Sequence, residues 1–341
     1  MSDRQTPLVL RYGALGDMVM TTPALRALAA CHGAPCAVAA LGAWVPQLYR
    51  GLPFVGEIAT VRSRKAPYWC SPDQWRLAAF LRRFRGHPVY LMVGDERSGA
   101  LAARAGLVAT ASIFATGTLP NEHQVDNQRR VCGFAADGYD RVPELASSAE
   151  ELAAARAFLA AEAGGAPVVL VHAGNKKTMG GGWRKRSGNL KDWPTERWVE
   201  TVRAVLAHKP EARVLLTGSA GEQELVAGIV AACGDQRVAS IAGRTGLRQL
   251  LALLRLVHSM ISVDTGPAHA AAAVGCPLAV LFGQTDPRTN GPVPRSSPVA
   301  IVTGPPGAPA PDGEAGWAAH HRMDGIAVAQ VVEAWRGLGA R

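Results

Sequence analysis

The chain alternates short apolar runs with segments of helical periodicity along its whole length, and this alternation limits the folds open to it. Apolar runs of this kind are typical of strands buried on both faces of a parallel sheet. We expect such strands at residues 8–11, 37–41, 89–93 and 112–115 in the first half, and at 168–172, 213–217, 238–241, 260–263 and 278–282 in the second. The pattern predicts the α/β class, with two doubly wound, Rossmann-like domains.

The length and one glycine pair suggest where these domains meet. A chain of 341 residues suffices for two domains of ordinary size. An alanine-rich helical pattern starts at Ser148 and ends in Gly164-Gly165, after which a new strand pattern begins. We therefore expect domains at 1–163 and 164–341. By analogy with other two-domain folds, we expect a last helix, at about residues 324–338, to pack back on the N-terminal domain.

Composition and charge narrow the class of protein. With 48% hydrophobic residues, no apolar run of the roughly 18 residues that a membrane span needs and no secretory leader, the sequence favours a cytoplasmic location. The six cysteines are scattered without metal-ligand spacing, so we expect no disulfide framework and no metal site. The net charge of +9 implies an acidic partner. Without a recognition helix, stacking platform or zinc module, specific nucleic-acid binding is disfavoured.

The stretch from Asp264 to His269 is the most informative motif. It lies between an apolar run and a run of alanines, so it predicts a strand that passes into a helix through a tight polar turn. Such a turn presents backbone N–H groups at a helix N-terminus, and Pro267 suits the first helical turn. With side-chain donors from Thr265 and His269, the element suits a phosphate group. An ordinary capped helix is the alternative.

A second candidate follows the first expected strand. There Gly13-Ala14-Leu15-Gly16-Asp17 has G-x-x-G spacing, which is neither the dinucleotide fingerprint nor a Walker loop. Asp17 stands where a helix begins, so its carboxylate either caps that helix or faces the ligand edge of the sheet as a general base.

Two more loops follow expected strands of the second half. The glycine-rich, basic loop from His172 to Lys191 suits a phosphate clamp, and a solvated basic loop is the alternative. Lys191 is the better candidate there because Trp193-Pro194 anchors the next helix. Glu222 follows a Gly-rich turn, where an acid can bind two ribose hydroxyls or stabilise a helix N-terminus.

The motifs together resemble glycosyltransferase family 9, the ADP-heptose:lipopolysaccharide heptosyltransferases. The matching pieces are RYGALGDMVMTTPALRAL, KDWPTERWVE, LLTGSAGEQE and SVDTGPAHAAAAVGCPLAVLFGQTDP, which occur in family order across nearly the whole chain. The resemblance implies the GT-B fold, with a nucleotide-sugar donor in the second domain and an acceptor in the first. It also implies ADP-heptose as the donor substrate, with no metal and no further cofactor.

The resemblance further implies roles for single residues. Asp17 matches the base that deprotonates the acceptor hydroxyl, with inversion in a single displacement. Glu222 matches the ribose-binding acid, and Asp264 a contact to the donor sugar or its turn. The positions that match diphosphate-binding residues are Lys191, Thr265, Gly266 and His269.

The chain departs from the family in the loop 175–190, which is longer and more basic than in the lipopolysaccharide core enzymes. Donor phosphate contacts there fall to Asn175, Lys176 or backbone amides. For an acidic glycan or glycolipid acceptor we assign Gly16, Arg62, Arg64, Lys65, Arg97 and His123. We also expect peripheral contact with an anionic membrane. Trp69 and Trp75 nearby suit stacking on sugar or contact with lipid headgroups, or are core residues of a basic helix face.

Other interpretations of the sequence keep the fold but change the function. The same fold can use another nucleotide sugar or a soluble acceptor, or act as a nucleotide-sugar epimerase or hydrolase. A non-catalytic nucleotide-sugar binding protein is the remaining alternative. The presence of Asp17, Lys191 and His269 together favours an enzyme.

Overall fold

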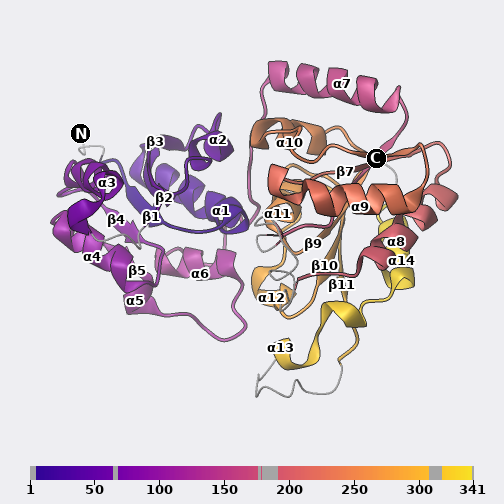
Figure 1. Ribbon diagram of the computed structural model, residues 1–341. Coiled ribbons are helices and arrows are strands. Elements are labelled where there is room, and N and C mark those ends of the chain that lie inside the picture. The colour runs from indigo at the N-terminus through magenta and orange to yellow at the C-terminus, as the bar shows by residue number, and fades with distance from the viewer. Residues whose placement is uncertain (1–4, 64–67, 176–177, 179–190, 307–316, 340–341) are drawn as a thin grey trace. The chain divides into compact units, whose positions relative to one another are not determined.

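The computed structural model describes residues 5–63, 68–175, 178, 191–306 and 317–339. The chain divides into two compact units, residues 1–146 and 147–341, each built on its own parallel sheet with helices around it (Figure 1). The α/β class and the two doubly wound sheets expected from the sequence are confirmed.

The first unit is a five-stranded sheet in the order β3-β2-β1-β4-β5, with β1 at its centre. Leu8 of β1 pairs with Ala37 of β2 on one side and Val89 of β4 on the other. The strands are β1 (Leu8–Arg11), β2 (Cys36–Leu41), β3 (Val55–Val61), β4 (Val89–Leu91) and β5 (Ala111–Ser112). The helices are α1 (Leu15–His32), α2 (Val45–Tyr49), η1 (Tyr68–Cys70), α3 (Pro72–Arg82), α4 (Glu96–Arg104), α5 (Ile113–Thr116) and α6 (Gln124–Val131).

The second unit is a six-stranded sheet in the order β11-β10-β9-β6-β7-β8. Its strands are β6 (Val168–His172), β7 (Arg213–Leu216), β8 (Val238–Ser240), β9 (Ser259–Val263), β10 (Leu278–Phe282) and β11 (Val299–Thr303). Its helices are α7 (Ala149–Ala163), α8 (Thr195–His208), η4 (Ala220–Glu222), α9 (Gln223–Cys233), α10 (Leu247–Leu254), α11 (Gly266–Ala273), α12 (Pro287–Asn290), α13 (Trp317–His320), η5 (Met323–Gly325) and α14 (Val328–Arg336).

Three strand predictions differ from the structure. The sequence analysis missed β3 and β11, each of which lies at one edge of its sheet and keeps exposed or half-buried positions, so they lack a continuous apolar run. The strand expected at residues 112–115 is wrong, because only Ser112 belongs to β5. Its side chain accepts a hydrogen bond from the Phe114 N–H (3.1 Å) and so starts helix α5.

Two domain predictions also need correction. Helix α7 belongs to the second unit, because it packs on α10 and its Glu151 accepts a hydrogen bond from Arg248 Nε (2.7 Å). The boundary therefore falls at 146/147 and not at 163/164. Helix α14 belongs to the second unit: it packs on α8, β10 and β11, with Trp335 in the core of that unit and its Nε1 donating to Ser259 Oγ (2.8 Å).

Candidate functional site

Loops at the carboxyl edge of the second sheet gather the strongest group of candidate residues. In open α/β sheets this edge is where ligands bind, because loops and helix N-termini meet there. Strands β6, β7 and β9 are neighbours or near neighbours, and all run parallel. The loops that follow them therefore leave the sheet side by side.

The turn after β9 has the form that the sequence predicted. The backbone leaves the strand at Asp264, Thr265 is the N-cap residue, and α11 begins at Gly266 with Pro267 in its first turn. The Thr265 hydroxyl does not cap the helix; it donates to Val263 O (3.2 Å). The first N–H groups of a helix have no intrahelical acceptor, and the helix dipole adds partial positive charge there. The turn is therefore suited to bind an anion.

Asp264 ties this turn to Lys191, 73 residues earlier in the chain. The Lys191 ammonium donates to a carboxylate oxygen of Asp264 and lies 3.3 Å from its backbone oxygen. His269 Nε2 lies 3.8 Å from the other carboxylate oxygen. Burial is the largest single effect and raises the pKa of Asp264, but the neighbouring His269 ring and Lys191 ammonium together lower that pKa below its ordinary value. The carboxylate therefore stays charged and holds both side chains in place.

His269 leaves one nitrogen uncommitted. The residue is 6% exposed, and within the described part of the chain its Nδ1 is buried without a hydrogen-bond partner. Buried polar atoms are nearly always paired, so each exception asks for an explanation. A ligand oxygen at the start of α11 would provide the missing partner.

A second polar cluster joins the loops after β6 and β7. Glu222 is 3% exposed, and its Oε2 accepts from the Ser219 N–H (2.7 Å) and hydroxyl (2.9 Å) at the start of η4. Its Oε1 lies 2.9 Å from the hydroxyl of Thr178. Gly174 runs so close that an added Cβ would lie 1.9 Å from Oε1. Glu222 thus stabilises the start of the helix, which was one of the two roles considered for it from the sequence. Binding of ribose hydroxyls by Glu222 stays a prediction.

Thr178 extends this cluster toward Lys191. Its hydroxyl accepts from the Asn175 N–H (2.7 Å) and lies 2.6 Å from Asn175 O. The Asn175 amide in turn donates to Lys191 O (3.3 Å). A chain of contacts therefore runs from Glu222 to Lys191. The sequence analysis missed Thr178, and a lone Thr within a basic loop gave no signal by which to find it.

His172, at the carboxyl end of β6, is also part of this edge. It is 6% exposed, and its Nδ1 lies 3.2 Å from Thr217 O. Burial lowers the pKa of His172 below its ordinary value, although the nearby Glu222 carboxylate acts in the opposite direction. The ring is therefore neutral at pH 7. A histidine that ends an otherwise apolar strand was the available signal in the sequence.

In the first unit, Asp17 lies at the carboxyl end of β1, in the first turn of α1. Its Oδ2 accepts from the Ala14 N–H (2.8 Å), and its Oδ1 accepts from Arg11 Nη2 (3.1 Å). A Cβ at Gly13 would come within 2.4 Å of Asp17 Cβ, so a glycine is needed there. The carboxylate caps helix α1, which was one of the two roles considered for Asp17 from the sequence, yet 30% of its side chain is exposed.

Arg11 links Asp17 to the start of α6. The same Arg11 Nη2 donates to Gln124 Oε1 (2.9 Å), while Nη1 donates to Met92 O (2.7 Å). His123 is the N-cap residue of α6, and its Nδ1 accepts from the Val125 N–H (3.2 Å). The structure therefore brings the candidate acceptor residue His123 near Asp17, although the two are more than a hundred residues apart.

The other acceptor candidates are less closely grouped. Gly16 is buried in the first turn of α1, next to Asp17. Arg62 is highly exposed and lies 3.7 Å from Asp73, and Arg97 is exposed on α4. Three predicted site residues lie outside the described residues: Arg64, Lys65 and Lys176.

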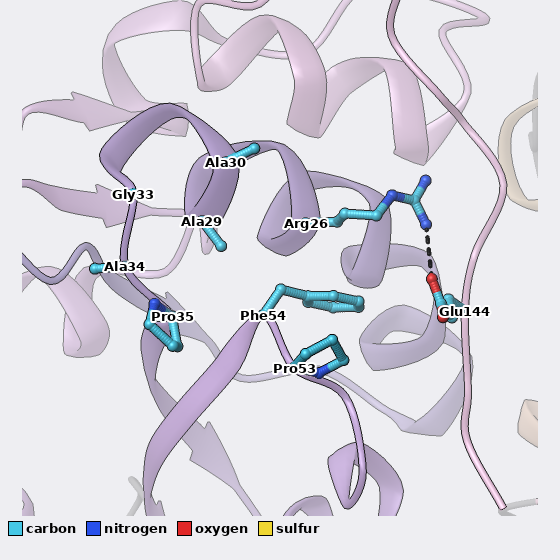
Figure 2. Close-up of a pocket in the computed structure, with 9 residues that line it drawn as sticks. All are labelled: Arg26, Ala29, Ala30, Gly33, Ala34, Pro35, Pro53, Phe54 and Glu144. Atoms are coloured by element: carbon cyan, nitrogen blue, oxygen red, sulfur yellow. Dashed lines mark hydrogen bonds and ion pairs between the residues drawn. The ribbon is translucent and has the colours of Figure 1, made fainter.

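A shallow pocket of about 430 Å³ in the first unit lies away from this edge. Figure 2 shows Pro35, Pro53 and Phe54 on its wall, with the ion pair of Arg26 and Glu144 (3.3 Å) at one side. Pro35 precedes β2 and Phe54 precedes β3, so the pocket lies at the amino ends of these strands. Asp17 follows the carboxyl end of β1, so the pocket and Asp17 are at opposite edges of the sheet.

Neither a metal-binding cluster nor a membrane-spanning helix is present among the described residues. They contain no group of three or more His, Cys, Asp or Glu side chains arranged to hold a metal ion. Within the described part of the chain, no helix is long and apolar enough to span a bilayer.

Comparisons with known proteins identify relatives. The family model of glycosyltransferase family 9 (heptosyltransferase) matches residues 71–307. Lipopolysaccharide core heptosyltransferase OpsX of Haemophilus influenzae is 36% identical over 104 residues, which are 30% of this chain and 29% of that protein. Lipopolysaccharide heptosyltransferase 2 of Salmonella typhimurium is 30% identical over 121 residues, 34% of each protein. The matched segments thus span about a third of these relatives' length.

Similar solved structures cover nearly the whole chain. E. coli ADP-heptose lps heptosyltransferase II is similar with a TM-score of 0.72 and 20% identity over 98% of both chains. A glycosyl transferase family 9 protein from Veillonella parvula has a TM-score of 0.73 and 17% identity over 98% of this chain and 97% of its own. These similarities confirm the GT-B fold expected from the sequence.

Proposed function

The chain belongs to glycosyltransferase family 9 (heptosyltransferase), and on this basis we propose that it transfers a heptose from ADP-heptose to a hydroxyl group of a lipopolysaccharide inner-core or related glycan acceptor. The observation that carries this proposal is the group at the N-terminus of α11, where Lys191, Asp264 and His269 meet. It combines a cation, a helix dipole and a buried unpaired ring nitrogen, which suit the diphosphate of a nucleotide sugar.

In this proposal Asp17 is the general base. Its carboxylate takes the proton of the acceptor hydroxyl while the hydroxyl oxygen forms a bond to the anomeric carbon. The bond from that carbon to the diphosphate oxygen breaks on the opposite face, so the configuration inverts and ADP leaves. Lys191 and the first N–H groups of α11 stabilise the charge that grows on the leaving diphosphate, and no metal ion is needed. The partial exposure of Asp17 at the carboxyl end of β1 supports this role.

Nucleotide binding tests the donor. Calorimetry with ADP, UDP, GDP and dTDP should show selective binding of ADP, and tighter binding of ADP-heptose. A preference for UDP or dTDP would leave the fold intact and overturn the donor. Absence of any nucleotide binding would favour the remaining alternative, a protein whose catalytic machinery has decayed.

Replacement of the base tests the mechanism. Asp17→Asn keeps a side chain that can cap α1 and removes the proton acceptor, so turnover should fall by at least about a hundredfold, the lower end of general-base contributions. ADP-heptose affinity should stay at the wild-type value, because the proposed donor site lies in the other unit. Asp137→Asn, at an exposed aspartate of the same unit, is the matched control. Near-normal turnover of Asp17→Asn would remove Asp17 from this role.

A further inference from the structure

Arg11 is a charged residue at the end of a buried strand. It is the last residue of β1, the central strand of the first sheet, and its side chain is only 11% exposed. A buried guanidinium group is costly unless a carboxylate pairs with it. Arg11 Nη2 lies 3.1 Å from Asp17 Oδ1. An otherwise apolar strand therefore ends in a charge whose partner is the proposed base.

Two contacts hold the carboxylate of Asp17, one on each oxygen. Its Oδ2 accepts from the Ala14 N–H (2.8 Å), and this contact by itself caps helix α1. Rotation of an aspartate carboxylate about the Cβ–Cγ bond is soft, so a single hydrogen bond leaves the carboxylate plane free to turn. The second contact, from Arg11 Nη2 to Oδ1 (3.1 Å), fixes that plane. Arg11 thus supplies what capping does not need, a defined direction for the lone pairs of Asp17.

Arg11 is itself held by two further elements. Its Nη1 donates to Met92 O (2.7 Å) directly after β4, and its Nη2 also donates to Gln124 Oε1 (2.9 Å) at the start of α6. The Met92 N–H donates to Leu10 O (3.0 Å), so Met92 continues the pairing of β1 with β4. Helices α1 and α6 pack on each other (Figure 1). Strand β4 and helix α6 therefore fix the place of the planar guanidinium group.

From these contacts we propose that Arg11 is a positioning residue for the transfer reaction: it sets the orientation in which Asp17 receives the proton of the acceptor hydroxyl. The proposal rests on the role of Asp17 as general base. A carboxylate has about four lone-pair sites, so the contacts with Ala14 and Arg11 leave sites for a hydroxyl group. Since 30% of the Asp17 side chain is exposed, an acceptor can reach it. Gln124 supports the same orientation indirectly, by holding Arg11.

Two other roles of Arg11 predict different results. A purely structural role changes the stability of the protein and leaves kcat at the wild-type value. Direct binding of an acidic acceptor by Arg11 contributes equally to the ground state and the transition state, so its loss raises KM and leaves kcat unchanged. A positioning role lowers kcat, because a displacement of 1 Å costs up to about a hundredfold in rate.

Turnover of Arg11 variants tests the proposal, with ADP-heptose and heptose-free lipopolysaccharide core fragments as substrates. Arg11→Met keeps much of the side-chain length and removes the charge and the donors, so kcat should fall about ten- to a hundredfold. Arg11→Lys keeps the charge without the planar fork and should recover part of that loss. The affinity for ADP-heptose should stay at the wild-type value in both variants, since the proposed donor site lies in the other unit.

Arg26→Met is the matched control. Arg26 is another partly buried arginine of the first unit, paired with Asp140 (2.6 Å) and Glu144 (3.3 Å). Its replacement should lower the melting temperature and leave kcat unchanged. Gln124→Met removes an acceptor of Arg11 Nη2 and should lower kcat by a smaller factor than Arg11→Met. Because this variant leaves the ion pair of Arg11 intact, it tests the proposal even if Arg11→Met does not fold.

A double-mutant cycle shows whether Arg11 acts through Asp17. Asp17→Asn removes the base, so a group that only positions the base has nothing left to position. In the Asp17→Asn background, Arg11→Met should therefore change kcat by no more than about twofold. A crystal structure of Arg11→Met should show the Asp17 carboxylate turned away from its wild-type orientation.

Four results would overturn the positioning role alone. These are wild-type kcat in Arg11→Met, a raised KM with unchanged kcat, losses that multiply in the double variant, and an Asp17 carboxylate that keeps its orientation in Arg11→Met. Near-normal turnover of Asp17→Asn, or a wild-type protein that transfers no heptose, would instead remove the proposed function, and the role of Arg11 would fall with it. The two failures are therefore distinguishable.

Discussion

Replacing Thr178 by valine removes one hydroxyl group from the contacts that connect the loops after β6 and β7. Valine has nearly the same shape, so the change removes hydrogen bonds and leaves little empty volume. The lost contacts are those to the Asn175 N–H and O and to Glu222 Oε1, at 2.7, 2.6 and 2.9 Å. Thr178 is 7% exposed, so water cannot easily replace its hydroxyl.

The expected cost follows from the charge of Glu222. A hydrogen bond to a charged group contributes about 1.5–3 kcal/mol, and a buried acceptor left unpaired costs a similar amount. For a unit of residues 147–341, each kcal/mol lowers the melting temperature by about 2–4 °C. We therefore expect the second unit of Thr178→Val to unfold roughly 3–12 °C below the wild type.

The same substitution should weaken ADP binding. Asn175 holds the backbone of Lys191 (3.3 Å), and Lys191 bonds to Asp264 beside the start of α11. Loss of the Thr178 hydroxyl removes its two contacts with the Asn175 backbone, so Lys191 is less well positioned for the diphosphate. A structural role confined to stability would lower the melting temperature and leave ADP affinity unchanged below the transition.

Calorimetric unfolding and ADP titration of three variants test this reasoning. Thr178→Ser keeps the hydroxyl and should restore most of the stability and the affinity. Thr201→Val removes a buried hydroxyl from α8, where it donates to Arg197 O (2.8 Å), and should lower stability without changing ADP affinity. If Thr178→Val unfolds and binds ADP like the wild type, the hydroxyl does not hold this loop. If Thr178→Ser is as impaired as Thr178→Val, packing of the methyl group and not hydrogen bonding is responsible.

Three further predictions concern pH, phosphate binding and metal ions. Burial lowers the pKa of His172 below 6.5. Below about pH 6.5 the unfolded chain therefore binds a proton that the folded chain does not, and the free energy of unfolding decreases as the pH is lowered. The denaturant midpoint should therefore change less between pH 7.5 and pH 5.5 for His172→Gln than for the wild type. His208→Gln, at an exposed position, is the control and should behave like the wild type. If His172→Gln shows the same change as the wild type, another group is responsible. Lys191→Met should weaken ADP binding at least tenfold and lower its salt dependence, and unchanged affinity would exclude Lys191 from the diphosphate site. Since Lys191 and α11 supply the positive charge, EDTA should leave ADP affinity and turnover unchanged, and a loss restored by a divalent cation would contradict this.

The sequence itself sufficed for the central strands of both sheets. Strands β1, β6 and β10 lie inside their sheets and are almost entirely buried, so their residues form runs that are apolar except for Arg11 and His172 at two carboxyl ends, and the predicted extents agree with the structure. The edge strands β3 and β11 have exposed positions, so their pattern merges with that of loops. The location of α7 was likewise hidden, because an alanine-rich helix does not indicate which of the two units it will pack in.

For the candidate site, the sequence by itself determined which chemical groups follow the strands: the phosphate turn after β9 and Asp17 after β1 are local patterns, set by residues adjacent in the chain. Only the tertiary structure decided how these groups are paired. Lys191 meets Asp264, and Thr178 meets Glu222, because the sheet places strand ends side by side that are far apart in the chain. Hydrogen bonds extend over about 3 Å and depend on angle, so their partners are fixed by packing and not by spacing in the sequence.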